Sequence, residues 1–88
     1  MNMKKVAFEP EAFADFGEWG IEDKKIFKKI LSLIKDIQRD PFSGIGKPEP
    51  LKYELQGYWS RRITDEHRLV YKVEEDVLII ISCKYHYD

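Results

Sequence analysis

The sequence is poor in the features that mark secreted and membrane-spanning proteins. It has one cysteine, Cys83, so no disulfide can form within the chain, and a reducing compartment is expected. Its longest apolar run, residues 77–81, is far too short to cross a bilayer. No basic segment followed by an apolar one opens the chain, as a secretory signal would. We therefore expect a cytoplasmic protein without a membrane partner.

Basic residues are not in excess. The chain has 15 lysines and arginines against 16 aspartates and glutamates, with a formal net charge of −1. Proteins that bind nucleic acid usually show a basic excess, so the net charge argues against this class unless the basic residues cluster locally. The two histidines, His67 and His86, have no cysteine or carboxylate cluster at metal-ligand spacing, and no metal or cofactor is expected.

The first half of the chain predicts a strand and two helices. At 88 residues the chain forms one domain, residues 1–88, with a small core. Residues 5–8 indicate an opening strand, after which Pro10 begins a helix that Gly20 is expected to end. The second helix runs to Asp40, and an apolar stripe at helical spacing defines its buried side: Ile26, Ile30, Leu33, Ile34 and Ile37.

The second half of the chain predicts a sheet. Residues 41–50 contain three prolines and two glycines, which favours an irregular loop. Strands are expected at residues 51–55, 58–63, 67–73 and 77–85, joined by turns so short that they form an antiparallel meander. The order β-α-α-β-β-β-β predicts an α+β domain, in which two N-terminal helices pack on one face of a twisted, mainly antiparallel sheet.

Strand alternation predicts a cluster of polar groups on the open face of this sheet. Leu69 and Tyr71 should face the core, which leaves Arg68 on the other face, where Arg62 of the neighbouring strand can meet it. The chain ends in Lys-Tyr-His-Tyr-Asp, so an imidazole lies between two phenols just after a buried strand. The candidate site comprises the residues Glu49, Lys52, Arg62, Arg68, His86 and Tyr87.

These side chains could cleave RNA without a metal ion. A carboxylate can take the proton of a ribose 2′-hydroxyl, a guanidinium can stabilise the charged phosphate, and an imidazole can protonate the departing oxygen. Each group also has a simpler explanation. His86 could be an ordinary surface residue, Glu49 could serve only solubility, and the two arginines could form exposed ion pairs with Asp65 and Glu66.

Four segments, in the same order along the chain, closely resemble the YoeB toxin family, which belongs to the RelE/ParE superfamily of bacterial toxin–antitoxin systems. They are Lys-Pro-Glu-Pro-Leu-Lys at 47–52, Gly-Tyr-Trp-Ser-Arg-Arg-Ile at 57–63, Glu-His-Arg-Leu-Val-Tyr at 66–71 and Lys-Tyr-His-Tyr at 84–87. The resemblance implies a RelE-like fold and a ribosome-dependent endoribonuclease that cuts mRNA. It further implies a YefM-type antitoxin as partner and a homodimer.

The resemblance also assigns roles to residues. It implies that Glu49 is the general base, Arg68 the phosphate-stabilising residue and His86 the general acid. Tyr87, Lys52 and Arg62 would contact the substrate. The sequence departs from the family at its end, where Lys84 replaces an expected arginine and Asp88 follows the expected last tyrosine.

Two other functions remain open from the sequence. Related ParE-type toxins inhibit DNA gyrase by binding and perform no RNA chemistry. An inactive copy could also persist as a partner for its antitoxin. The joint presence of Glu49, Arg68 and His86 favours the RNA-cleaving toxin, because a protein that only binds has no need to assemble a base, a cation and an acid.

Overall fold

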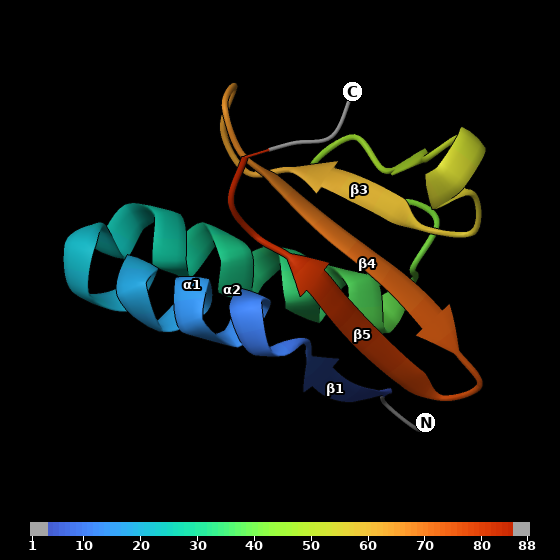
Figure 1. Ribbon diagram of the computed structural model, residues 1–88, viewed down its shortest axis with the longest axis horizontal. Helices are drawn as coiled ribbons and strands as arrows, with labels where there is room; N and C mark the ends of the chain where they lie inside the picture. The colour runs from blue at the N-terminus through green and yellow to red at the C-terminus, as the bar shows by residue number, and fades with distance from the viewer. Residues whose placement is uncertain (1–3, 86–88) are drawn as a thin grey trace.

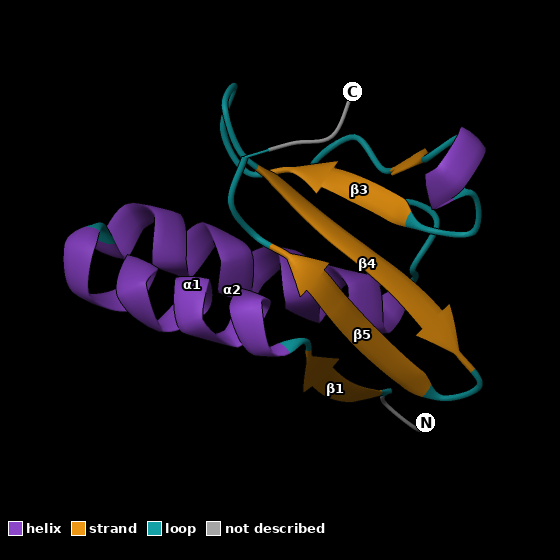
Figure 2. Ribbon diagram, in the orientation of Figure 1, coloured by secondary structure: helices purple, strands orange, loops and turns teal. Residues whose placement is uncertain are grey.

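The computed structural model describes residues 4–85, which form two helices and a five-stranded sheet (Figures 1 and 2). The helices form one layer and cover one face of the sheet (Figure 1). The strand order is β1-β5-β4-β3-β2. The elements are β1 (Lys5–Phe8), α1 (Pro10–Glu22), α2 (Lys24–Arg39), β2 (Glu49–Pro50), a 3₁₀ turn η1 (Tyr53–Leu55), β3 (Trp59–Arg62), β4 (Arg68–Glu74) and β5 (Val77–Ser82). The expected α+β architecture is confirmed.

The second helix follows its sequence pattern closely. The Asp23 side chain accepts hydrogen bonds from the backbone N–H groups of Lys25 and Ile26, which caps the start of α2. The predicted stripe faces the sheet, and Ile30, Leu33 and Ile37 of it have no solvent exposure. Neither helix described in residues 4–85 is long and apolar enough to cross a membrane.

The first helix extends two residues beyond Gly20, where the sequence predicted its end. A Cβ atom at Gly20 would lie 3.2 Å from the ring of Phe27 in α2. This glycine therefore lets the two helices approach closely near their connection, and it does not act as a terminator. Asp23 follows Glu22 directly and caps α2, so the helices are joined by a single non-helical residue.

The strand predicted at residues 51–55 is wrong. Tyr53 has a φ of 58°, a left-handed conformation that an extended strand does not contain, and η1 occupies residues 53–55. The strand that pairs with β3 is instead β2, in which Glu49 lies opposite Ser60. The predicted irregular loop is thus shorter than expected. The last strand also ends earlier, at Ser82.

The sheet contains one parallel pair of strands and is otherwise antiparallel. β2 to β5 are antiparallel, as expected, and β1 pairs in parallel with β5 at the sheet's edge. Leu69 and Tyr71 face the helices and are fully buried, as strand alternation predicted. Cys83 is buried in the same core, where desolvation raises the pKa of its thiol to about 12 and keeps it protonated.

Arg61 in β3 is fully buried although it carries a charge. Its guanidinium donates to the Asp36 carboxylate and the Tyr71 hydroxyl. It also donates to three backbone carbonyl oxygens in the segment after α2, those of Asp40, Ser43 and Ile45. The Tyr71 hydroxyl in turn donates to the carbonyl oxygen of Pro41 at 2.6 Å. A buried charge needs such pairing, so this network joins α2, the loop, β3 and β4.

Arg61→Met should strongly destabilise the fold. It removes the donor to the carbonyl oxygens of Asp40 and Ile45, and it leaves the Asp36 carboxylate with only Arg39 and the Ile45 N–H as partners. Removing one partner of a buried ion pair typically costs about 3–5 kcal/mol. The free energy of unfolding, measured by urea denaturation, should fall by about that amount. The matched control is Arg62→Met, because Arg62 is the next residue and is exposed on the opposite face. The control should change the free energy by no more than about 0.5 kcal/mol. Equal losses in both variants would contradict the role given to Arg61.

Asp36 should make the fold sensitive to acid. Its pKa is lowered from 3.8 to about 2, chiefly because the Arg61 guanidinium donates a hydrogen bond to the carboxylate. The unfolded chain therefore binds a proton at a higher pH than the folded chain, so acid favours unfolding. The contribution of Asp36 is complete above its ordinary pKa and is lost as the pH falls toward 2.

The test is Asp36→Asn, followed by urea denaturation over a pH series. The variant should be less stable than the parent at neutral pH, and the difference should shrink between the ordinary pKa of 3.8 and pH 2. A difference that stays constant across this range would show that Asp36 does not cause the acid sensitivity.

Candidate functional site

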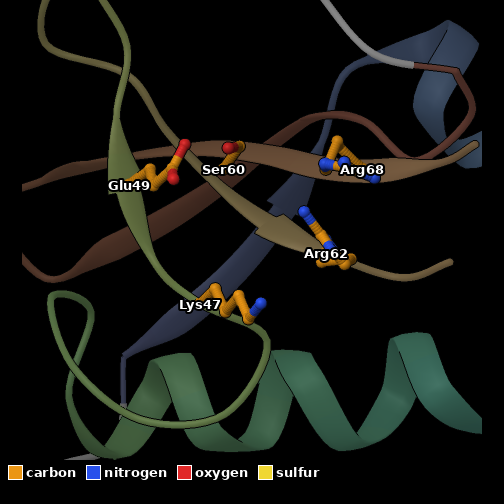
Figure 3. Close-up of a pocket in the computed structure, with 5 residues that line it drawn as sticks. All are labelled: Lys47, Glu49, Ser60, Arg62 and Arg68. Atoms are coloured by element: carbon orange, nitrogen blue, oxygen red, sulfur yellow. The ribbon is translucent and has the colours of Figure 1, made fainter. Parts of the chain in front are cut away.

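A small pocket lies on the face of the sheet that the helices leave open (Figure 3). Strand register explains its composition, because Glu49 of β2 is opposite Ser60 of β3, and Arg62 of β3 is opposite Arg68 of β4. Side chains at alternate positions of a strand share a face, so Ser60 and Arg62 point to the same side. The residues that line the pocket are Lys47, Glu49, Ser60, Arg62 and Arg68.

The loop reaches the pocket through Gly46. The carbonyl oxygen of Gly46 accepts a hydrogen bond from the N–H of Arg62 at 2.6 Å. Its φ is +79°, and a Cβ atom there would lie 2.7 Å from a methyl group of Leu33 in α2. Only glycine fits between helix and strand in this conformation. Gly46 therefore delivers the next residues, Lys47 and then Glu49, to the edge of β3.

Arg68 is held in place by one end of its guanidinium. Its Nη1 atom donates to the backbone carbonyl oxygens of Thr64, Asp65 and His67, at 2.6, 3.2 and 3.1 Å. These carbonyls belong to the turn between β3 and β4. Within residues 4–85, the other guanidinium nitrogens of Arg68 make no hydrogen bond. The side chain is thus anchored to the turn and still presents donors to the pocket.

The pocket carries excess positive charge. It contains three cationic side chains and one carboxylate. In the described part of the chain, Lys47, Glu49 and Arg62 form no ion pair, so their charges are available to a ligand. Lys47 and Arg62 extend toward the space that Glu49, Ser60 and Arg68 border (Figure 3). A chain with a net charge of −1 therefore concentrates positive charge at one point, which favours an anionic ligand.

The size of the pocket limits what it can enclose. Its volume is about 50 Å³, which exceeds the roughly 10–15 Å³ that one water molecule needs. Sites that bury a whole small ligand measure about 300–1,000 Å³. The pocket therefore suits a single charged group such as a phosphate, while the remainder of a ligand would lie across the open face of the sheet.

The structure brings together three of the six residues expected at the site: Glu49, Arg62 and Arg68. Lys52 does not line the pocket, because the chain leaves the sheet after β2 and Lys52 precedes η1. His86 and Tyr87 lie outside the described residues. The exposed ion pairs considered for the two arginines do not occur within residues 4–85. Arg68 contacts Asp65 through the backbone carbonyl of that residue and not through its carboxylate.

Sequence reasoning did not propose Lys47 and Ser60 as site residues. Ser60 alternates with Arg61 on β3 and therefore shares the face of Arg62, which was a usable signal. It is 8% exposed and forms part of the pocket wall beside Glu49. Lys47 had no such signal, because its position depends on the fit of Gly46 against α2. Within residues 4–85, no group of three histidine, cysteine or acidic side chains is arranged to hold a metal ion.

Known proteins similar to this chain are toxins. The protein named Toxin YoeB of Escherichia coli (strain K12) is 57% identical over 83 residues, which cover 94% of this chain and 99% of that protein. The YoeB dimer from Staphylococcus aureus is 50% identical, with a TM-score of 0.91 over 98% of this chain and all of that chain. A YoeB–YefM complex from the same organism is 49% identical, with a TM-score of 0.89 and the same coverage.

More distant similarity establishes the fold class. The toxin–antitoxin complex RelBE2 from Mycobacterium tuberculosis is 22% identical, with a TM-score of 0.71 over 97% of this chain and all of that chain. At this identity the similarity concerns the fold alone, and it confirms the expected RelE-like fold. The family is established by a family model described as "YoeB-like toxin of bacterial type II toxin-antitoxin system", which matches residues 8–87. The chain therefore belongs to the YoeB-like toxins of bacterial type II toxin–antitoxin systems.

Proposed function

We propose that this toxin is a ribosome-dependent endoribonuclease that cleaves mRNA by attack of a ribose 2′-hydroxyl. The observation that carries the proposal is the position of Glu49, whose carboxylate lies in a pocket with three cations and forms no ion pair with a described residue. A general base must be free to accept a proton, and the phosphate it serves must be bound beside it. The pocket offers both conditions within one small volume.

Glu49 begins the reaction by taking the proton of the 2′-hydroxyl. The resulting oxygen attacks the adjacent phosphorus, and the bond from phosphorus to the 5′-oxygen breaks. Arg68, Arg62 and Lys47 stabilise the negative charge that grows on the phosphoryl oxygens. The products are a 2′,3′-cyclic phosphate and a 5′-hydroxyl, and this division of roles requires no metal ion.

The departing 5′-oxygen needs a proton, and we assign its delivery to His86. An imidazole exchanges protons near neutral pH, which makes histidine the commonest general acid. Tyr87 contacts the substrate beside it. Lys52, which lies outside the pocket wall, contributes at most to binding the RNA farther along the strand.

The ribosome supplies the binding surface that the toxin lacks. Affinity for free RNA depends on the number of phosphates that lysine and arginine neutralise. This chain has a net charge of −1, and its pocket holds about one phosphate-sized group. Presentation of mRNA by the ribosome therefore compensates for weak binding of free RNA.

The protein partners follow from its relatives. We propose that a YefM-type antitoxin and a second copy of the chain bind this toxin, as the Staphylococcus aureus YoeB structures contain a YefM complex and a dimer. Several large apolar side chains are exposed and could be covered in such assemblies. They are Phe13, Ile21, Phe42, Ile45 and Tyr53.

Glu49→Gln should abolish most of the cleavage, because the amide cannot accept the 2′-hydroxyl proton. The expected loss in rate is roughly 10²–10⁴-fold, measured on ribosomes programmed with a defined mRNA. The matched control is Glu54→Gln, since Glu54 is an exposed carboxylate in η1 that does not line the pocket. The control should cleave at the parental rate.

The same preparations distinguish cleavage from a gyrase-binding toxin. The parent should stop translation in a cell-free extract and leave DNA supercoiling by gyrase unchanged. Inhibition of gyrase with undisturbed translation would favour the non-catalytic alternative and reject the proposed function. Equal cleavage by the parent and Glu49→Gln would reject the role of Glu49 alone.

A 2′-deoxy nucleotide placed on the 5′ side of the cut should prevent cleavage at that bond, because the substitution removes the nucleophile. Gel analysis of ribosome-bound mRNA should show the product lost at the substituted bond and retained at other sites. The retained products should carry the cyclic phosphate. Cleavage of the substituted bond would mean that water or another group attacks the phosphorus.

A further inference from the structure

Two hydrogen bonds, one at the N–H and one at the carbonyl oxygen, hold the backbone of Tyr85. Its N–H donates to Nδ1 of His67 at 2.8 Å, and its carbonyl oxygen accepts a hydrogen bond from the N–H of Arg68 at 2.9 Å. Tyr85 has a φ of 61°, a left-handed conformation that residues other than glycine rarely adopt. Such a conformation persists where the surroundings impose it, and here two adjacent residues of another segment do so.

His67 is itself firmly placed. It is 7% exposed, and its backbone N–H donates to Oγ1 of Thr64 at 3.0 Å. The indole ring of Trp19 in α1 packs edge-on against the imidazole, with ring centres 4.9 Å apart. The same indole donates to the carbonyl oxygen of Cys83 at 3.0 Å. Contacts from α1 and from the turn before β4 therefore fix the ring and the chain that leads to Tyr85.

The hydrogen bond also defines the tautomer of the neutral His67 ring. A nitrogen that accepts a hydrogen bond from a backbone N–H carries no proton, so the neutral ring holds its proton on Nε2. Nε2 lies 3.6 Å from the Glu66 carboxylate. A protonated Nδ1 would instead face the Tyr85 N–H, and two donors cannot bond to each other. The hydrogen bond to Tyr85 thus requires the tautomer with its proton on Nε2.

We propose that His67 is a positioning residue for the C-terminal segment that carries the general acid. The inference rests on the proposed function, in which His86 protonates the leaving oxygen. His86 follows Tyr85 directly in the chain. The hydrogen bond from the Tyr85 N–H to the His67 side chain therefore fixes the residue from which the last segment continues. Arg68 completes the arrangement, because its backbone holds Tyr85 while its side chain lines the pocket. The dipeptide His67-Arg68 thereby both holds Tyr85 and contributes to the phosphate pocket.

A buried histidine could instead serve only to fill space, and two substitutions separate these roles. His67→Asn keeps an acceptor, because the asparagine oxygen and Nδ1 are both attached to Cγ. His67→Leu fills a similar volume without an acceptor. Both variants lose the aromatic contact with Trp19, but His67→Leu fills the site better and only His67→Asn keeps the hydrogen bond to Tyr85. A purely space-filling role therefore predicts that His67→Leu performs at least as well as His67→Asn.

The first measurement is independent of activity. Hydrogen exchange of the Tyr85 amide, followed by NMR, should be slow in the parent and in His67→Asn and fast in His67→Leu. Nitrogen NMR of the parent imidazole should show the proton on Nε2. A proton on Nδ1, or equal exchange in the two variants, would overturn the proposed hydrogen bond.

The second measurement is the rate of cleavage on programmed ribosomes. A misplacement of about 1 Å in a catalytic arrangement can cost about 10²-fold in rate, so His67→Leu should cleave roughly 10- to 100-fold more slowly. Its dependence on ribosome concentration should be unchanged, since the pocket is intact. His67→Asn should recover most of the rate. Ile37→Val, a core substitution in α2, provides a destabilised control that should keep the parental rate.

The outcomes decide the positioning role and the proposed function separately. Equal loss of rate in His67→Asn and His67→Leu would show that only packing matters and would overturn the positioning role. An expected exchange pattern with unchanged rates would also overturn it, because the hydrogen bond would then have no effect on catalysis. Failure of the parent to cleave would refute the proposed function and with it any catalytic effect of His67, while the exchange pattern would still decide whether His67 holds Tyr85.

Discussion

A charged guanidinium, that of Arg61, lies in the interior of the protein without solvent contact. Its five hydrogen-bond partners come from α2, the following loop and β4, so the burial is stable only when all of these are in place. The loop could otherwise have many conformations, as its glycines and prolines suggest. Arg61 selects one of them, and Gly46 then fits between α2 and β3. The position of Glu49 is therefore a consequence of a charge buried on the opposite face of the sheet.

Neighbouring arginines in β3 show how one strand serves two purposes. Arg61 points toward the helices and organises the structure, whereas Arg62 points to the open face and lines the pocket. The period of two along a strand separates these roles completely. The core face of the sheet meets apolar helix residues and is sealed, while the open face keeps charges that no described residue neutralises. The residues that stabilise the fold and the residues that line the pocket therefore lie on the same strand but on opposite faces of the sheet.

Local patterns in the sequence predicted the parts of the structure that depend on periodicity. The stripe on α2, the buried face of β4 and the meeting of Arg62 with Arg68 all follow from spacing alone. Glu49 entered the candidate site because its loop leads into the sheet, and the family resemblance then assigned it the role of general base. Contacts between distant segments could not be predicted. Arg61 and Asp36 are 25 residues apart, and His67 and Tyr85 are 18 apart. The error at residues 51–55 has a similar origin, because apolar alternation there favoured a strand and the left-handed Tyr53 prevents one.

The parallel pairing of β1 with β5 has a consequence for synthesis of the protein. β5 lies inside the sheet, between β1 and β4, and contributes the fully buried Leu78 and Ile80 to the core. A growing chain that has not yet released these residues from the ribosome lacks the strand that joins β1 to β4. Pairings between distant segments also form late in folding, because a long loop must close first. A chain whose synthesis stops before β5 therefore lacks the centre of the sheet and part of its core.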